Sequence, residues 1–374
     1  MAKTEIAFLF IGGTHHVAHV APVAAELSRR MPDAHVRCLH ADPETGKAIA
    51  EVARAMEAPA LSIEEVAIPA SGHWLARITG RKTATKGPLL LRFARMLRKA
   101  TVIATPERTS AALKTFHLTR APLIHFRHGA GDRAPKSEKR LKAFDLILVP
   151  GEKDTKRAVE AQAIPRERLV EIGYVKLDYL ARGAASRPPL FDNDRPVVLY
   201  NPHFDPAISS LDAAREVIAA FAAQDRYNLV YAPHIRASDD MSAETMAAWQ
   251  ALAIPGQIMI DLRSPRLTDM TYTLGADIYL GDVSSQFYEF IAQPRPAAFL
   301  NTHGVAWETD LRYANWHLGE VANGPADMIA AIDRAVAGHD TTAPRQRAAV
   351  EYAMGRWQGA IARAADAVMA AIRR

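Results

Sequence analysis

Serine and carboxylate side chains follow one apolar run in a pattern suited to nucleotide binding. In Asp277–Pro296 (DIYLGDVSSQFYEFIAQPRP), Asp282, Ser284 and Ser285 open a predicted helix that carries Glu289. Backbone N–H groups and the helix dipole point outward at such a start, so the two serines are placed to bind a phosphate. Glu289 lies one helical turn beyond Ser285, where a carboxylate can accept both hydroxyls of a ribose. A serine N-cap followed by a surface glutamate explains the same pattern equally well.

A histidine follows another apolar run, in Leu123–Arg133 (LIHFRHGAGDR). Glycines beside His128 let a ligand approach the backbone, and a histidine at the carboxyl end of a strand is well placed as a general base. Arg133 can bind a phosphate as a planar fork. The alternative is a turn histidine among ordinary loop charges.

Two further loops each place a histidine directly after a proline. They are Tyr200–Asp205 (YNPHFD) and Tyr231–Arg236 (YAPHIR). His234 and Arg236 are able to neutralise charge on a transferred phosphate, and we expect one of the two loop histidines to be only structural. The residues of these loops assigned to the donor side are Asn201, His203, His234 and Arg236.

The elements that must position these side chains alternate along the chain. Short apolar runs rich in β-formers alternate with alanine-rich helical stretches, which predicts parallel sheets wrapped by helices. Strands are predicted at Ile6–Ile11, His35–His40, Val66–Pro69, Val102–Ala104, Leu123–Phe126, Leu146–Val149, Pro196–Tyr200, Leu229–Ala232, Ile258–Asp261, Ile278–Gly281 and Ala297–Asn301. A helix is expected from about Val20, and one or two more from Pro344 to the end.

A proline-rich break, Ala184–Pro196 (AASRPPLFDNDRP), has the composition of a linker between two such halves. We therefore predict an α/β fold of the GT-B type, two Rossmann-like doubly wound domains that face a central cleft. The predicted parts are an acceptor domain at residues 1–184, a nucleotide-donor domain at 197–343 and a helix at 344–374 that returns to the first domain. Fold alone does not name a reaction.

The first loop, Gly12–Pro22 (GGTHHVAHVAP), fits this fold. Many GT-B enzymes have a glycine-rich turn and a His-x-x-Pro segment here, facing the acceptor, which corresponds to His19 and Pro22. His16 and His19 are therefore acceptor-side candidates. No carboxylate lies near these histidines in the sequence, and no metal site is expected.

Composition, charge and hydropathy indicate the cellular environment of the protein. The 374 residues carry a net charge of +5 and one cysteine, Cys38, so an internal disulfide is excluded. No signal peptide and no apolar run of about 20 residues is found, so we expect a cytoplasmic protein. No acidic residue lies between Glu65 and Glu107, whereas eight basic residues do: Arg77, Arg81, Lys82, Lys86, Arg92, Arg95, Arg98 and Lys99.

This basic stretch predicts an amphipathic helix on an anionic membrane surface, with Leu90, Phe93 and Leu97 inserted into the lipid. A solvated helix face over the core is the competing interpretation. Nucleic acid is not expected as a partner, because no recognition motif or aromatic platform accompanies the charge.

Together the segments resemble the CDP-glycerol glycerophosphotransferase family over about residues 125–300. The family's His-Gly with a downstream basic residue is similar to His128-Gly129 and Arg133. Its Gly-x-x-[Arg/Lys]-x-Asp segment matches Gly173–Asp178 (GYVKLD), and its Asp-x-Ser-Ser-x-x-x-[Asp/Glu] signature matches Asp282 to Glu289. The chain departs from the family at Ala130-Gly131, where Thr-Pro is typical, and at Pro233, which precedes its histidine instead of following it.

The resemblance implies transfer of a phosphoglycerol-type group from a CDP-activated donor to a hydroxyl of a lipid-linked or membrane-associated acceptor, with release of CMP. It implies His128 as the base, His234 at the phosphates, no cofactor, and a peripheral position at the inner face of the cell membrane. Alternatives are a GT-B glycosyltransferase that uses a UDP- or GDP-sugar, a UDP-sugar 2-epimerase, and a catalytically idle nucleotide-sugar-binding protein.

Overall fold

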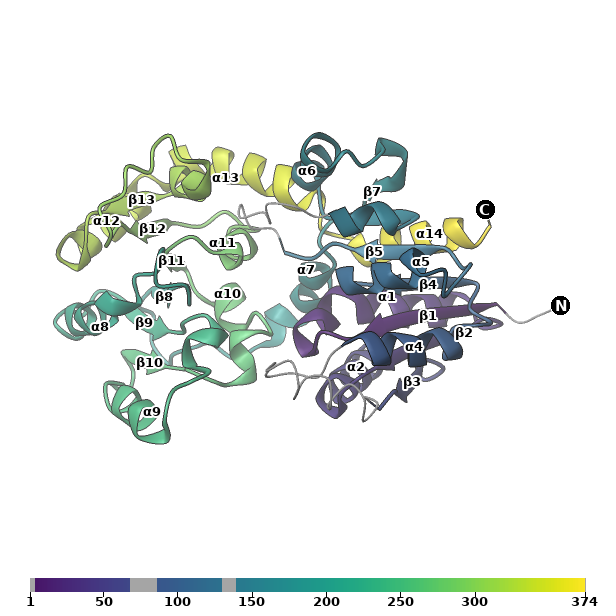
Figure 1. Cartoon of the computed structure of the whole chain (residues 1–374). Helices are drawn as coiled ribbons and strands as arrows, with labels where there is room; N and C mark the ends of the chain where they lie inside the picture. The colour runs from purple at the N-terminus through teal and green to yellow at the C-terminus, as the bar shows by residue number, and fades with distance from the viewer. Residues whose placement is uncertain (1–3, 68–85, 130–138, 374) are drawn as a thin grey trace. The chain divides into compact units, whose positions relative to one another are not determined.

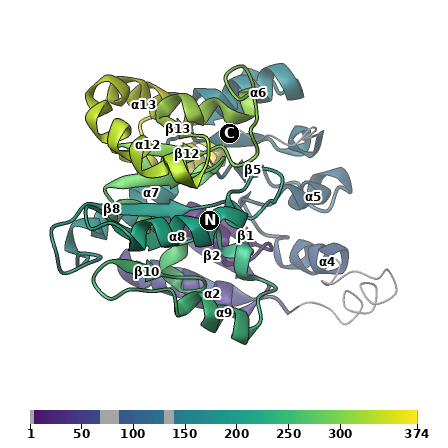
Figure 2. The same cartoon turned by 90° about the vertical axis from the view of Figure 1, so that its left-hand side faces the viewer.

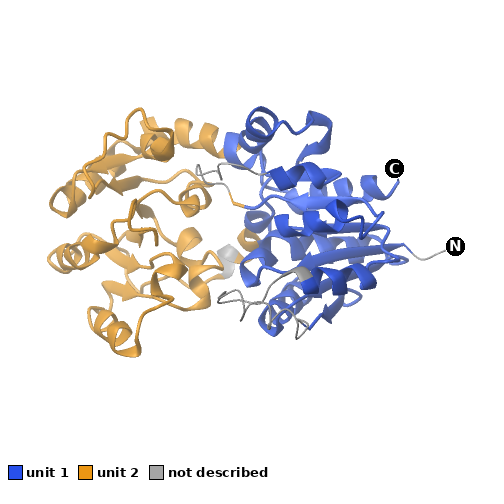
Figure 3. Cartoon of the chain, viewed as in Figure 1, with its two compact units in different colours: residues 1–128, 135–179, 352–374 blue, residues 129–134, 180–351 orange. Residues whose placement is uncertain are grey.

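The computed structural model describes residues 4–67, 86–129 and 139–373 (Figure 1; Figure 2). The chain divides into two compact units (Figure 3). The first consists of residues 1–128, 135–179 and 352–374, and the second of residues 129–134 and 180–351. The second unit therefore begins at Leu180, four residues before the proline-rich break.

The first unit is built on a seven-stranded parallel sheet with the order β3-β2-β1-β4-β5-β6-β7. Its strands are β1 (Glu5–Phe10), β2 (His35–His40), β3 (Ser62–Glu65), β4 (Val102–Thr105), β5 (Leu123–Phe126), β6 (Leu146–Val149) and β7 (Leu169–Glu171). The order reverses between β1 and β4, which is the switch point where ligands bind in doubly wound folds.

Both faces of this sheet are covered, so its strands are apolar on both sides. Along β1, Phe8 and Phe10 face one core and Ala7 and Leu9 the other. The first core also receives α1 (Val17–Arg30), α2 (Pro43–Ala55) and α14 (Ala360–Ile372), and the second receives α4 (Lys86–Met96), α5 (Ala112–Thr115) and α6 (Glu152–Gln162).

The second unit has a six-stranded parallel sheet with the order β10-β9-β8-β11-β12-β13. Its strands are β8 (Val197–Asn201), β9 (Asn228–Tyr231), β10 (Ile258–Ile260), β11 (Ile278–Gly281), β12 (Ala297–Leu300) and β13 (Glu320–Ala322). Helices α8 (Ala214–Ala222) and α12 (Pro325–Ala337) pack on one face, and on the other Tyr279 contacts two phenylalanines of α11 (Ser285–Phe290). The remaining helices are α9 (Ala243–Gln250), α10 (Thr271–Gly275) and α13 (His339–Met354).

Helix α14 is held in the first unit by the segment Gly173–Asp178, which ends within α7 (Val175–Leu180). The Asp178 carboxylate accepts hydrogen bonds from the backbone N–H groups of Gly359, at 3.2 Å, and Ile361, at 2.9 Å. Gly173 has a φ of 86°, and a Cβ there would lie 3.1 Å from Cβ of Ala360. The glycine and the aspartate of this segment therefore dock and cap α14.

Most predicted strands are confirmed, and the differences lie at sheet edges. The strand predicted at Val66–Pro69 lies earlier, at Ser62–Glu65, and residues 68 and 69 are outside the described part of the chain. The edge strands β7 and β13 have three residues each and were not predicted. The C-terminal tail forms two helices, because Gly355 and Gly359 both have positive φ.

Helix α4 presents its apolar side to the core. Leu90, Phe93 and Leu97 are at most 6% exposed and belong to the second core of the first unit. Their predicted insertion into lipid is therefore wrong, because these side chains already fill the core. Arg92, Arg95, Arg98 and Lys99 are exposed, while Arg77, Arg81 and Lys82 lie outside the described residues. In the described part of the chain, no helix combines the length and apolar composition needed to cross a bilayer.

Candidate functional site

Three strand ends of the first unit bring two histidines and a glutamate into contact. His16 follows β1, Glu107 follows β4 and His128 follows β5. Nδ1 of His16 lies 3.0 Å from Oε1 of Glu107, and Nε2 of His16 lies 3.1 Å from Nε2 of His128. The strand order places the end of β4 between those of β1 and β5, which explains why the three residues meet.

A glycine makes room for this contact. A Cβ at Gly12 would overlap Oε1 of Glu107 and lie 2.8 Å from Cε1 of His16. The glycine-rich turn after β1 is therefore required by close packing of the Glu107 carboxylate against the imidazole.

The surroundings lower the pKa values of His128 and of the neighbouring His19. Desolvation, followed by repulsion from His16 and His15, lowers the pKa of His128 to about 3, although part of its side chain remains exposed. Glu107 and a hydrogen bond to the Phe126 carbonyl act in the opposite direction. Burial, and then the charge of Lys176, lower the pKa of His19 well below its usual value. A neutral imidazole is able to accept a proton.

The three histidines predicted for this part of the site are thus brought together. The ring centroid of His128 lies 4.3 Å from that of His16 and 5.7 Å from that of His19. Glu107, which is distant from these histidines in the sequence, was missed. Arg133 lies outside the described residues. Among the described residues, no group of three His, Cys, Asp or Glu side chains is arranged to hold a metal ion.

The second unit brings together the two loop histidines. The rings of His203 and His234 lie 5.5 Å apart, and both contact the ring of Phe204, at 4.3 and 4.7 Å. The guanidinium of Arg236 lies 4.1 Å from the centroid of the same ring. A cation and two imidazoles therefore gather after β8 and β9.

Backbone hydrogen bonds fix the proton positions of both imidazoles. The N–H of Asp205 donates to Nδ1 of His203 at 3.0 Å, and the N–H of Arg236 donates to Nδ1 of His234 at 3.2 Å. Desolvation and the charge of Arg236 lower the pKa of His234 to about 4, so this ring is neutral at pH 7. Each neutral ring then carries its proton on Nε2, and the cluster offers N–H donors suited to phosphate oxygens.

Two residues predicted to contact the donor are buried and support these loops. Asp282 is completely buried and accepts the backbone N–H groups of His203, at 2.9 Å, and Ser210, at 3.1 Å. Desolvation raises the pKa of its carboxyl group to about 6. Asn201 is 4% exposed and donates to the carbonyl of Ala232 at 2.6 Å. Both side chains hold the histidine loops in place, and their contact with a donor stays a prediction.

The serines and the glutamate around α11 fit the helix-capping interpretation in part and the nucleotide-binding interpretation in part. Ser284 is the N-cap of α11 and accepts the backbone N–H of Gln286 at 3.2 Å. Ser285 is exposed beside it. Glu289 is 4% exposed, so it is not the surface glutamate of the capping interpretation.

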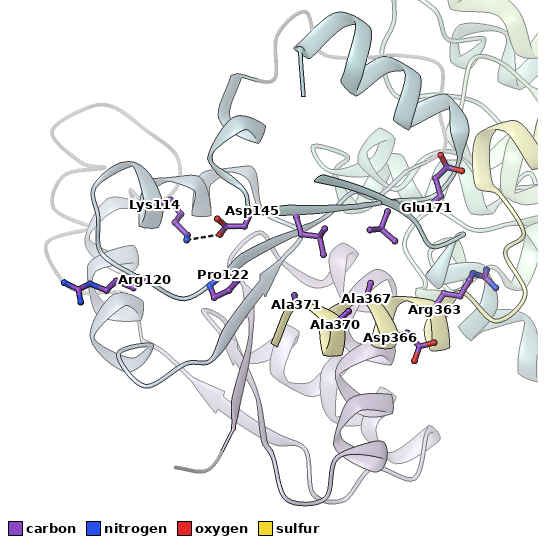
Figure 4. A pocket seen from close by; sticks show the side chains of 12 residues that line it. Lys114, Arg120, Pro122, Asp145, Glu171, Arg363, Asp366, Ala367, Ala370 and Ala371 are labelled. Carbon is purple, nitrogen blue, oxygen red and sulfur yellow. Dashed lines mark ion pairs between the residues drawn. The ribbon is translucent and has the colours of Figure 1, made fainter. Parts of the chain in front are cut away.

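A pocket of about 650 Å³ in the first unit lies away from these residues (Figure 4). Alanines of α14 line one side, and Lys114 and Asp145, paired at 2.8 Å, lie at another. Pro122 and Asp145 immediately precede β5 and β6, so the pocket lies at the amino ends of these strands. Because His128 follows the carboxyl end of β5, this pocket is not part of the histidine cluster.

No protein-family model and no curated protein sequence matches the chain. Solved structures do match. The wall teichoic acid polymerase TagF, soaked with CDPG, is 14% identical with a TM-score of 0.62, over 100% of this chain and 90% of that chain. UDP-GlcNAc 2-epimerase from Neisseria meningitidis, bound to UDP-GlcNAc, is 12% identical with a TM-score of 0.65, over 98% and 100%. S. aureus MnaA with UDP is 12% identical with a TM-score of 0.67, over 99% and 97%. The chain therefore has the α/β two-domain GT-B fold.

Proposed function

We propose that the protein transfers a phosphoglycerol-type group from a CDP-activated donor to a hydroxyl of a membrane-associated acceptor and releases CMP. The observation that carries this proposal is the cluster of His203, His234 and Arg236. Nδ1 of each ring already accepts a backbone N–H group, so each ring has an Nε2–H donor left for a ligand, and the Arg236 guanidinium adds a positive charge. Such a cluster suits a group whose oxygens carry charge during transfer. The motifs shared with the CDP-glycerol glycerophosphotransferases and the fold shared with TagF support the same choice.

In this mechanism, the acceptor hydroxyl attacks the phosphorus that bears the glycerol group. A bond forms between the acceptor oxygen and that phosphorus, and the bond from phosphorus to the oxygen of CMP breaks. His128 takes the hydroxyl proton, and CMP leaves with the electron pair of the broken bond. The loop histidines and Arg236 bind the phosphoryl oxygens, while Ser285 and Glu289 bind the nucleotide. Positioning and charge stabilisation supply most of the catalysis in such transfers.

The test is release of CMP from CDP-glycerol in the presence of a lipid-linked acceptor. His128→Ala should lower the rate by about 10²–10⁴ with little change in donor affinity, as expected for one acid–base group. His117→Asn is the control, because His117 is exposed and asparagine tolerates its positive φ of 52°. A wild-type protein that binds CDP-glycerol but never releases CMP refutes the proposal.

A UDP-sugar 2-epimerase is the second candidate, since the structure of such an enzyme with bound UDP-GlcNAc has the same fold. The contact between Glu107 and His16 also offers an acid–base pair for proton exchange at a sugar carbon. Calorimetric titration with CMP, CDP, UDP and GDP separates the candidates by their base preference. Tight UDP binding together with epimerisation of UDP-GlcNAc would replace the first proposal with the second.

We also propose an anionic membrane surface as a partner, on electrostatic grounds. The exposed side of α4 and the residues after it carries Arg92, Arg95, Arg98 and Lys99, and Leu91 beside them is 55% exposed. Each basic residue near such a surface contributes about 1 kcal/mol, screened within roughly a Debye length. A surface of this kind would keep the protein near a lipid-linked acceptor.

A further inference from the structure

We propose that a groove in the first unit binds a single-chain anionic amphiphile, with its head group on Arg120 and its alkyl chain along α14. This groove is the pocket of about 650 Å³ at the amino ends of β5 and β6. His128 follows the opposite, carboxyl end of β5, so the groove is separate from the histidine cluster. Binding there therefore does not depend on the proposed transfer reaction.

Helix α14 leaves this groove open because one of its flanks carries only short apolar side chains. Its buried face, which includes Ala365 and Val368, belongs to the first core and packs against α1 and over β4 and β6. The adjoining flank lines the groove through Ala367, Ala370 and Ala371 (Figure 4). The methyl groups of these alanines are short, so space remains between the helix and the neighbouring strands.

The opposite wall of the groove is apolar as well. It is formed by Leu146 of β6, Val170 of β7 and Pro122, which precedes β5. The lining part of α14 extends from Arg363 to Ala371, about 12 Å along the helix axis at about 1.5 Å per residue. Small-molecule sites have volumes of about 300–1,000 Å³ and mostly apolar walls. The groove has both properties, and its length suits an extended alkyl chain.

Most charged groups at the groove are already bound. Its three carboxylates each pair with a cation. These pairs are Lys114 with Asp145 at 2.8 Å, Asp366 with Arg30 at 2.6 Å, and Glu171 with Arg166 at 3.3 Å. The guanidinium of Arg363 donates to three backbone carbonyls. A ligand with a positive charge would therefore compete for carboxylates that already have partners.

Arg120 differs from these groups. It is exposed, lies at the end of the groove opposite Arg363, and has no ion pair or hydrogen bond with any residue that the structure describes (Figure 4). A guanidinium binds a carboxylate or a phosphate through two parallel N–H bonds. An anionic head group at Arg120, with its chain between α14 and the strands, matches both the free cation and the apolar walls.

A second copy of the chain fits the groove less well than a small amphiphile. Twelve residues line the groove, whereas one side of a stable protein interface has about 20–30 residues. The small lined surface, the cavity volume and the single free cation favour one chain with one charged head group.

Calorimetric titration with dodecanoate, below its micellar concentration, tests the chemistry of the ligand. Dodecanoate should bind at one site, and dodecyltrimethylammonium should bind about tenfold more weakly, because its head group cannot accept from Arg120. Octanoate should bind more weakly by on the order of 10²-fold, since each CH₂ group removed from the groove weakens binding about fourfold. No binding of dodecanoate, or equal affinity for the two dodecyl compounds, overturns the proposal.

Charge reversal tests the role of Arg120. Arg120→Glu should reverse the preference between dodecanoate and dodecyltrimethylammonium, because the head-group position then carries a negative charge. Arg54→Glu is the matched control, since Arg54 is also an exposed arginine of the first unit but lies on α2 and does not line the groove. The same change in preference in both variants would show that overall charge, and not Arg120, selects the head group, and would overturn the assignment.

Filling the groove tests its location. Ala367→Leu and Ala370→Leu should each weaken dodecanoate binding by about tenfold, because leucine occupies the space of several CH₂ groups of the chain. Ala362→Leu is the control, at an exposed site of α14 that does not line the groove. Thermal unfolding checks that each variant folds, and a dodecanoate with a diazirine on its chain should label the peptide that contains residues 363–371. Unchanged binding in both groove variants, or labelling elsewhere, overturns the proposed location.

Two further measurements address the other possible outcomes. Sedimentation velocity should give the same oligomeric state for the wild type and Ala370→Leu; a dimer that dissociates in the variant would assign the groove to a second copy and overturn the proposal. Saturating dodecanoate should leave CMP affinity unchanged, because the groove is separate from the predicted nucleotide site. Competition between dodecanoate and CMP would place the chain outside the groove and overturn the proposal, whereas absence of CMP binding affects only the proposed function.

Discussion

Replacing Asp178 with alanine should destabilise the first unit substantially without affecting nucleotide binding. Asp178 is 7% exposed, and its carboxylate accepts two backbone N–H groups at the start of α14, from Gly359 and Ile361. Neither amide has an acceptor within its own helix, because the first turn of a helix leaves its N–H groups unsatisfied. Alanine therefore leaves two donors without their acceptor in a site that water reaches poorly.

The magnitude follows from these contacts. Loss of an N-cap costs about 0.5–2 kcal/mol, and a hydrogen bond to a charged group contributes about 1.5–3 kcal/mol. These two descriptions overlap, so we expect a loss of about 2–4 kcal/mol in the free energy of unfolding of the first unit. With a urea dependence near 2 kcal/mol per molar, the transition midpoint should fall by about 1–2 M.

Urea unfolding followed by circular dichroism measures this loss, and hydrogen exchange of peptides from residues 359–372 localises it. Asp366→Ala is the control, since Asp366 lies on the same helix, is 59% exposed and pairs with Arg30 at 2.6 Å. An exposed ion pair contributes only about 0–1 kcal/mol. Equal effects of Asp178→Ala and Asp366→Ala, or loss of CMP binding in Asp178→Ala alone, would refute the structural role of Asp178.

Three further predictions concern the second unit and the surface. Glu289→Ala should weaken CMP binding by about 1–3 kcal/mol, the cost of a ribose hydroxyl without its partner; unchanged affinity in calorimetry removes Glu289 from the site. Since burial raises the pKa of Asp282 to about 6, its contribution to stability is complete below about pH 4 and is lost as the pH rises through 6. The unfolding free energy of Asp282→Asn should therefore vary less between pH 4 and 7 than that of the wild type, and an identical pH dependence contradicts this. Exchange of Arg95 and Arg98 for glutamate should abolish salt-sensitive co-sedimentation with anionic vesicles; wild-type binding that ignores lipid charge rules out the electrostatic surface.

The interior of each sheet could be predicted from the sequence because its strands are buried on both faces. A run such as IAFLF in β1 is apolar throughout, and few other structures place so many large apolar residues in succession. The edge strands lack this signal. In β3, SIEE has one apolar residue, and β7 and β13 have three residues each, so hydrogen bonding to the neighbouring strand determines them more than composition does.

The candidate site could be predicted only where a residue type is informative by itself. Histidines after apolar runs are uncommon, so His128, His203 and His234 stood out. Glu107 did not, because a glutamate after a proline is unremarkable until the strand order is known. The order β1-β4-β5 supplies the missing information, since it places whatever follows β4 between His16 and His128.

Burial separates residues that build the site from residues able to react. Asp282 lies in a segment that resembles a family signature. It is fully buried and holds the His203 loop, and Ser284 of the same segment caps a helix. Asp178 of another shared segment caps α14. Each of these roles is required by the fold and would persist in proteins with different reactions. The two aspartates and Ser284 therefore support the architecture. The inference of phosphoryl transfer rests on the histidines, and backbone amides orient the rings of His203 and His234.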